Sequence, residues 1–230
     1  MKIGLFSDAH YSSAVSTGLR LNNQSLRKIR EAYADFAEQG CELVVCLGDL
    51  IDTEPTPDRE AENLAEVGRV IRESGIPTVC VRGNHDAFAM GAARFYEILG
   101  IPAVEELCPV GKRLLFLDAC YSRDGRPYVP GDIDWTDTFY PYAERLAERL
   151  RRGKEDTYLF VHQNLDPAVE CHHRIANADA LMELIRETGV VKAVYQGHYH
   201  PGCDSEYDGV RYITLPAMCE GEGAFTVVDL

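Results

Sequence analysis

The chain of 230 residues carries a formal net charge of −14, and 46% of its residues are hydrophobic. This composition excludes a disordered chain, and its acidity disfavours a binder of nucleic acid duplexes, whose affinity comes mainly from lysine and arginine. No apolar run is long enough to cross a membrane, and residues 1–7 lead into a strand pattern instead of a signal peptide. We therefore expect a cytoplasmic protein that binds neither a nucleic acid duplex nor a membrane.

Short apolar runs recur along the chain and predict β-strands. Most of these runs are continuous instead of alternating, which is typical of strands that are covered on both faces. The predicted strands are residues 2–7, 43–47, 77–81, 113–118, 157–161, 192–196, 210–215 and 224–229. Since no helical pattern separates the last two, we expect the sheet to become antiparallel at its end.

Amphipathic stretches lie between these runs and predict α-helices, because apolar residues recur in them every three or four positions. The predicted helices are residues 22–39, 60–74, 90–99, 135–152 and 176–188. A glycine follows each of them, at the position where a helix commonly ends in a left-handed residue. These glycines are Gly40, Gly75, Gly100, Gly153 and Gly189.

Repeated units of helix, glycine and strand predict a layered α/β fold with a largely parallel central part. No internal repeat, low-complexity segment or linker divides the chain. We therefore predict a single domain over residues 1–230, without a large cap.

Two segments rich in proline, glycine and charge, residues 52–59 and 120–134, are expected to be surface loops, and long loops in compact domains often carry function. Aromatic residues around the second loop either stack on a nucleoside base or anchor the loop to the domain. They are Tyr121, Tyr128 and Trp135.

Polar side chains directly follow five of the predicted strands, and five of the seven histidines lie among them. Because the carboxyl ends of strands in an open α/β sheet share one edge, where ligands bind, we expect these side chains to converge. Residues two apart in an extended chain point to the same side, so each pair of the type DxH or HxH is a natural chelating pair. The segments are Ser7-Asp8-Ala9-His10, Gly48-Asp49-Leu50-Ile51-Asp52, Gly83-Asn84-His85-Asp86, His162 and Gly197-His198-Tyr199-His200.

These side chains predict a metal site with nitrogen and oxygen ligands and no thiolate. The eight cysteines contain no CxxC pair, and those within apolar runs are expected to be reduced and buried. Mixed nitrogen and oxygen ligands favour Mn, Fe or Zn. Seven candidate ligands are too many for one ion and suit two ions about 3.5–4 Å apart that share a carboxylate. Two such ions would leave a positive pocket for an anionic substrate.

The order DxH, GDxxD, GNHD, H and GHxH, which runs from Asp8 to His200, resembles the calcineurin-like metallophosphoesterase superfamily. The resemblance implies a four-layer α/β/β/α sandwich with mixed sheets. It also implies a hydroxide held between two metal ions that attacks phosphorus in line. By the same resemblance the first metal would be held by Asp8, His10 and His200, the second by Asn84, His162 and His198, and Asp49 would bridge them.

The resemblance further assigns a proton donor. His85 is not needed as a ligand and would protonate the leaving oxygen, while Asp52 would orient it. The alternative for Asp52 is a carboxylate that caps a loop or helix, and Asp86 is interpreted as a helix N-cap.

Substrate contacts are expected from Asn84 and His85 and from His172 and His173, although an exposed polar loop is an equal interpretation of the last two. Loose similarity to the phosphodiesterase branch favours a phosphodiesterase or nucleotide pyrophosphatase that acts on a small phosphoester, nucleotides included. A phosphomonoesterase, including a protein phosphatase, is the alternative, but Arg82 is the only arginine within the motifs. A non-catalytic scaffold of the same fold is the third interpretation, which the complete set of ligands disfavours.

Overall fold

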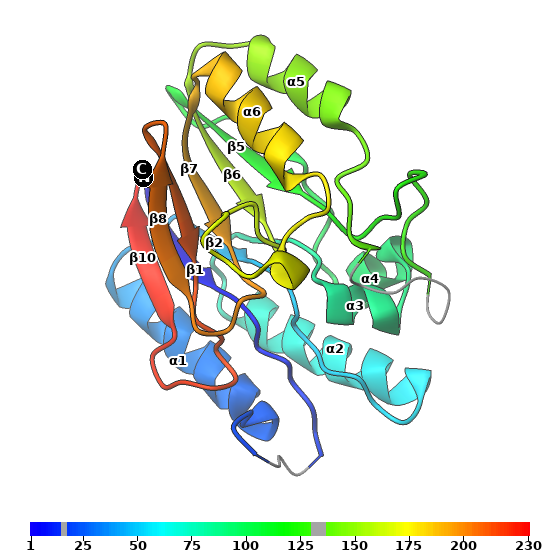
Figure 1. Ribbon diagram of the computed structural model, residues 1–230. Coiled ribbons are helices and arrows are strands. Elements are labelled where there is room, and N and C mark those ends of the chain that lie inside the picture. The colour runs from blue at the N-terminus through cyan, green and yellow to red at the C-terminus, as the bar shows by residue number, and fades with distance from the viewer. Residues whose placement is uncertain (15–17, 130–136) are drawn as a thin grey trace.

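Two β-sheets lie face to face in the middle of the molecule, and helices cover their outer faces (Figure 1). This computed structural model describes residues 1–14, 18–129 and 137–230. The first sheet contains β1 (Lys2–Phe6), β2 (Leu43–Cys46), β3 (Thr78–Cys80) and β10 (Phe225–Asp229) in the order β10-β1-β2-β3. Strands β1, β2 and β3 are parallel to one another, and β10 pairs antiparallel with β1.

The second sheet also mixes both directions, with four parallel strands between two antiparallel edges. Its order is β4-β5-β6-β7-β9-β8. The strands are β4 (Glu106–Leu107), β5 (Lys112–Leu117), β6 (Asp156–Val161), β7 (Val191–Gln196), β8 (Cys203–Tyr207) and β9 (Val210–Thr214).

The helices divide between the two outer faces. Buried residues of α1 (Ser25–Glu38), α2 (Pro57–Glu73) and α4 (Ala92–Leu99) share a core with the first sheet. Those of α5 (Ala143–Arg151) and α6 (Ala178–Thr188) share a core with the second. Short elements complete the fold, namely α3 (Asn84–Ala89) and the 3-10 turns η1 (Asn22–Gln24) and η3 (Cys171–His173).

A third core lies between the sheets and holds them together. Leu5 and Val45 of the first sheet belong to the same buried cluster as Phe116 and Phe160 of the second. Strands in such a position are buried on both faces, which explains why their sequences are continuous apolar runs. The predicted α/β/β/α sandwich with mixed sheets is therefore confirmed.

Three sequence predictions need correction. The last two predicted strands do not pair, because β9 belongs to the second sheet and β10 to the first. The helix predicted at 135–152 begins only at Ala143, and residues 130–136 lie outside the described part. Pro141 explains the late start, because the residue before a proline is disfavoured in the α region. Gly153 does not have the positive φ that we expected at all five glycines, whereas the other four do.

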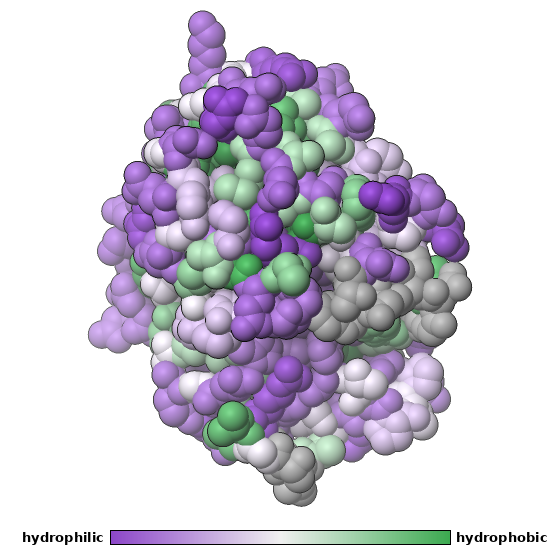
Figure 2. Space-filling view, in the orientation of Figure 1, coloured by the Kyte–Doolittle hydropathy of each residue, from purple (hydrophilic) through white to green (hydrophobic). Residues whose placement is uncertain are grey.

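In the described part of the chain, no helix is both long and apolar enough to cross a bilayer. Figure 2 shows a mostly hydrophilic face on which hydrophobic residues form small, separate groups.

Candidate metal centre

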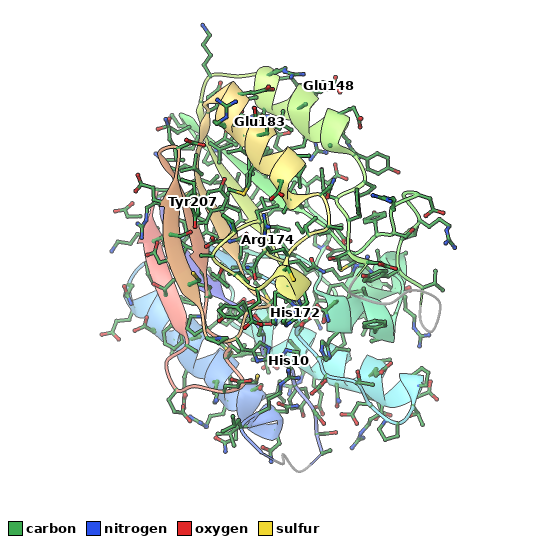
Figure 3. All side chains as sticks on the ribbon, in the orientation of Figure 1. His10, Glu148, His172, Arg174, Glu183 and Tyr207 are labelled. Atoms are coloured by element: carbon green, nitrogen blue, oxygen red, sulfur yellow. The ribbon has the colours of Figure 1, made fainter. Side chains whose placement is uncertain are left out.

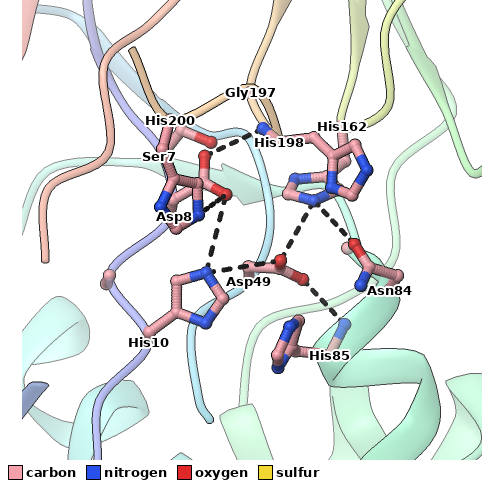
Figure 4. Close-up of polar contacts among 12 residues, drawn as sticks. Ser7, Asp8, His10, Asp49, Asn84, His85, His162, Gly197, His198 and His200 are labelled. Atoms are coloured by element: carbon pink, nitrogen blue, oxygen red, sulfur yellow. Dashed lines mark hydrogen bonds and ion pairs between the residues drawn. The ribbon is translucent and has the colours of Figure 1, made fainter. Parts of the chain in front are cut away.

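Five strands from both sheets present polar side chains at their carboxyl ends, and these side chains meet (Figure 4). Asp8, Asp49 and Asn84 follow strands of the first sheet, while His162 and His198 follow strands of the second. The expectation of a single sheet edge was therefore wrong, since the site lies where the ends of two packed sheets come together. Direct contacts join the two sides, such as the hydrogen bond from the His198 N–H to Asp8 Oδ2 at 3.0 Å.

The backbone at this site adopts an uncommon conformation. The φ angle is positive at four of the candidate ligands, Asp8 (55°), His10 (44°), Asp49 (51°) and His198 (67°). Residues other than glycine rarely adopt such angles, and they persist where surrounding contacts impose them, often at functional sites. Here the Asp8 and His10 N–H groups donate to the carbonyls of Gly48 and Asp49 at 3.0 and 2.8 Å.

Two of the motif glycines are required by close approach. A Cβ atom at Gly83 would overlap the Asp49 carboxylate, and one at Gly197 would overlap the Ser7 hydroxyl and approach Asp8 Oδ2 to 2.8 Å. These glycines therefore let the loops after β3 and β7 lie directly against the carboxylates.

The first group of candidate ligands consists of Asp8, His10 and His200, whose ligand atoms all lie within 4.8 Å of one another. Asp8 Oδ1 is 3.7 Å from His10 Nε2 and 3.6 Å from His200 Nε2. Asp8 and His10 are fully buried. Three nitrogen and oxygen donors thus surround one point.

The second group consists of Asp49, His162 and His198, whose ligand atoms also lie within 4.8 Å of one another. Asn84 adjoins it, with Oδ1 3.2 Å from His162 Nε2. His162 Nδ1 donates to the carbonyl of Leu47 at 2.6 Å, which fixes the tautomer and leaves Nε2 as the ligand atom. His198 and His200 thus fall into different groups, so the expected chelating pair is wrong, because the positive φ at His198 breaks the extended geometry.

Asp49 belongs to the second group and also reaches the first. Its Oδ2 atom is 3.5 Å from His10 Nε2 in the first group and 3.2 Å from His162 Nε2 in the second. Its Oδ1 atom accepts a hydrogen bond from the His85 N–H at 2.9 Å. One carboxylate oxygen is therefore within reach of both groups.

The residues present fit bound cations. Asp8 Oδ1 and both ring nitrogens of His10 are buried and have no hydrogen-bond partner in the described residues. Buried polar atoms normally have partners, so an orphaned carboxylate oxygen beside orphaned imidazole nitrogens indicates an ion as the missing partner. The donors are nitrogen and oxygen, a set suited to Mn, Fe or Zn.

The electrostatics of the histidines agree with this interpretation. Burial lowers the pKa of His10, and it lowers that of His198 to about 3, so both are neutral imidazoles, the form that binds metals. Burial alone would lower the pKa of His162 as well, but the carboxylates of Asp49 and Asp8 outweigh it and raise this pKa to about 9. The proton on His162 thus balances negative charge of Asp49 and Asp8, the same charge that a bound cation would balance.

His85 and Asp52 form a separate pair at the edge of the centre. His85 Nδ1 is 3.0 Å from Asp52 Oδ1, and the side chains are 25% and 19% exposed. Burial alone would lower the pKa of His85, but the carboxylates of Asp49 and Asp52 raise it above its ordinary value. The contact with Asp52 uses His85 Nδ1, so the Nε2 atom of the same ring takes no part in this pair.

Three neighbouring residues were missed by the sequence analysis. Glu220 Oε1 is 2.6 Å from His200 Nδ1, and Asn22 donates to Asp52 Oδ2 at 2.6 Å. The guanidinium of Arg20, 40% exposed, lies 4.0 Å from Asp52 and 3.8 Å from Glu220. All three lie in loops or a short turn without periodicity, and nothing in their spacing could have identified them.

Two other motif residues have structural roles. Asp86 is not an N-cap but the third residue of α3, and its carboxylate accepts from the N–H groups of Gly83 and Leu50 at 3.0 and 2.9 Å. Burial, followed by the charge of Asp49, raises its pKa to about 7. Arg82 is fully buried and donates to Asp118, so it does not face a substrate.

The loop that follows β6 carries His172 and His173 in the turn η3, and Figure 3 labels His172 there. The His173 ring centre is 5.0 Å from that of His198, so this turn adjoins the second group. In the 120–134 loop, Tyr128 is buried and stacks on Phe88 at 5.8 Å, which anchors the loop. Trp135 lies outside the described residues.

Comparison with known proteins identifies similar chains. The family described as "calcineurin-like phosphoesterase" matches residues 1–202. The chain is 25% identical to a protein named 3',5'-cyclic adenosine monophosphate phosphodiesterase from Haemophilus influenzae, over 85% of this chain and 66% of that protein. It is 22% identical to a probable cyclic nucleotide phosphodiesterase from Psychrobacter arcticus, over 93% of this chain and 78% of the relative.

The fold also has solved counterparts. A crystal structure described as a dimetal phosphatase from Danio rerio superposes with a TM-score of 0.84 over 100% of this chain and 92% of that one. The two sequences are 18% identical, so the likeness concerns the fold. The chain spans just under two thirds, 66%, of the length of the Haemophilus relative.

Proposed function

Because the chain belongs to the calcineurin-like phosphoesterase family, we propose that it hydrolyses a phosphodiester or a nucleotide pyrophosphate with two bound metal ions. The main support is the position of Asp49, whose Oδ2 atom is 3.5 Å from a nitrogen of one ligand group and 3.2 Å from a nitrogen of the other. A shared carboxylate between two ions is the arrangement used for displacement at phosphorus.

The ligands of each ion follow from the two groups. Bound divalent ions would supply positive charge that polarises the phosphoryl oxygens and makes water a better nucleophile at neutral pH. This chemistry requires the donors to be held rigidly, which burial provides for every candidate ligand except His200, whose side chain is 15% exposed. The first ion would be held by Asp8, His10 and His200, the second by Asn84, His162 and His198, and Asp49 would contact both.

His85 would give a proton to the leaving oxygen. Its Nδ1 atom faces Asp52 Oδ1 at 3.0 Å, so the proton at Nε2 is the one available for transfer. Asp52, itself held by Asn22 at 2.6 Å, orients the ring and stabilises its charged form. Asn84 and His85 would contact the scissile phosphate, and His172 and His173 would contact the substrate from the rim.

The preference for a diester rests on the relatives. Two proteins with 25% and 22% identity carry names of cyclic nucleotide phosphodiesterases. Arg82, the only arginine of the motifs, is buried against Asp118 and leaves the centre without a motif arginine for a phosphoryl dianion.

One observation favours the alternative, a phosphomonoesterase. Arg20 lies beside Asp52 and Glu220 at 4.0 and 3.8 Å, and its side chain is 40% exposed. These distances exceed normal hydrogen bonds, so its guanidinium retains donors for the additional charge of a monoester. Hydrolysis of an aryl phosphodiester and of its monoester by the same preparation, with Mn²⁺ added, decides between the two substrates.

The test of the whole proposal combines metal removal with Asp49→Asn. We expect chelation and the variant each to reduce diester hydrolysis at least about 100-fold, since groups that only support a ligand already cost about 10- to 100-fold. Asp58→Asn is the matched control, because Asp58 is an exposed residue of the first turn of α2. Full activity of the chelated protein or of Asp49→Asn would contradict the proposal, and inertness of the native protein toward every phosphoester would indicate a scaffold.

A further inference from the structure

A third set of side chains of the metal-ligating type lies outside the two groups described above. Glu170, His172 and His173 offer a carboxylate oxygen and two imidazole nitrogens that all lie within 4.8 Å of one another. They come from four consecutive positions around the turn η3. Neither the two ligand groups nor the proton-donor pair contains any of them.

The turn that carries these side chains is firmly attached to the domain. The His173 N–H donates to the Glu170 carbonyl at 2.9 Å, and the His173 carbonyl accepts from the Asn164 N–H at 3.1 Å. The guanidinium of Arg174 binds the Leu165 carbonyl at 3.0 Å and Asp179 at 2.6 Å. The ligand atoms are therefore placed by a fixed backbone, which lowers the entropic cost of gathering them around an ion.

One ring nitrogen of this set lacks a partner. His173 Nδ1 is buried and has no hydrogen-bond partner in the part of the chain that the structure describes. His172 Nε2 is 3.4 Å from Glu170 Oε2, and the two imidazole ring centres are only 4.1 Å apart. A cation between the three side chains would satisfy the orphaned nitrogen and explain why two imidazoles lie together.

We propose that Glu170, His172 and His173 bind a third divalent transition-metal ion at the mouth of the dinuclear centre. Two imidazoles and one carboxylate match the donor set of zinc sites that keep three protein ligands and an open coordination position. The His173 ring lies 5.0 Å from that of His198 and 5.2 Å from that of Tyr199, so the ion adjoins the centre. Its functional role, contact with an anionic substrate through the open position, rests on the proposed function, whereas the binding of the ion does not.

The count of zinc ions per chain tests the site. Metal-free protein is dialysed to equilibrium against buffered Zn²⁺, and bound zinc is measured by elemental analysis for the native chain and for His172→Ala and Glu170→Gln. We expect three ions in the native chain and two in His172→Ala, with the third bound at least about 10-fold more weakly in Glu170→Gln. His172 and Glu170 are 53% and 64% exposed, so neither substitution threatens the fold.

Two further variants make the result specific. Glu206→Gln removes another exposed carboxylate and should retain three ions. Asp49→Asn should still bind the ion that His172→Ala loses. The double variant Asp49→Asn/His172→Ala should therefore bind one zinc ion fewer than Asp49→Asn. Equal counts in the native chain and His172→Ala would overturn the proposal, whatever number of ions the dinuclear centre holds. Because zinc is counted without turnover, this outcome is independent of whether Asp49→Asn abolishes hydrolysis.

Discussion

The short segment after β3 supplies the basic residue of two ion pairs, Arg82 with Asp118 and His85 with Asp52. The two pairs differ in burial and in chemistry. Arg82 and Asp118 lie 2.9 Å apart, and the arginine side chain is fully buried. His85 and Asp52 lie 3.0 Å apart, and both side chains keep part of their surface exposed, 25% and 19%. The separations are nearly equal, so distance does not distinguish the fully buried arginine pair from the partly exposed histidine pair.

The difference lies in burial and in the proton. A guanidinium stays charged at all relevant pH values, and a buried one serves to hold the backbone in place. Arg82 does this by joining the segment before Gly83 to the end of β5 through Asp118. An imidazole can release its proton near neutral pH, and partial exposure gives it access to a substrate. We therefore propose a role in stability for Arg82 and a role in proton transfer for His85, three positions further along the chain.

The largest expected effect is that of His85→Asn on turnover. Loss of a general acid costs about 100- to 10,000-fold in kcat, because the leaving oxygen then departs without a proton. The loss should be smaller for a nitrophenolate leaving group, which needs no proton, than for an alcohol. The thermal midpoint should stay close to that of the native protein. Equal losses for both leaving groups would refute the proton-donor role.

Arg82→Met is expected to show the opposite behaviour, with its main effect on stability. It leaves the Asp118 carboxylate without its charged partner, and because this carboxylate is 24% exposed the cost in the free energy of unfolding should fall below the value of about 3–5 kcal/mol for a fully buried pair. The double variant Arg82→Met/Asp118→Leu should recover much of this loss, because no unpaired charge is left. Denaturant unfolding measures the stability of both variants. An unfolding midpoint of Arg82→Met equal to that of the native protein would contradict the stabilising role of the Arg82–Asp118 pair.

Asp52→Asn should produce the smallest change, a displacement of the pH profile. The Asp52 carboxylate is one of the charges that raise the pKa of His85, and the donor form exists only below this pKa. Activity therefore falls as pH rises through the pKa of His85, and the variant should lose activity at a lower pH than the native enzyme. An unchanged alkaline limb of log kcat would show that Asp52 does not act through His85.

The candidate ligands could be identified from the sequence because each directly follows a buried strand. The apolar runs defined strands such as β2 and β6 to within a residue or two, and therefore placed Asp49 and His162 at strand ends. The separation of His198 from His200 into two groups could not be derived from spacing, because it depends on a left-handed residue. The resemblance to the superfamily, and not the alternation of an extended chain, implied a division of these two histidines between different groups, as the structure has them.

Other parts of the site depend on contacts that no local pattern encodes. Glu220 reaches His200 from a loop between β9 and β10, and Arg20 reaches Asp52 across 32 positions. Strand β8 was missed because its sequence, Cys-Asp-Ser-Glu-Tyr, lies at a sheet edge and has no apolar run. Tertiary packing, and not periodicity, determines each of these features.

The most direct test of the central claim is a crystal structure of the Mn²⁺-loaded protein with anomalous scattering measured at the manganese edge. We predict two peaks about 3.5–4 Å apart, with Asp49 Oδ2 in contact with both. A single peak, or peaks that avoid Asp8, Asp49 and His162, would contradict it.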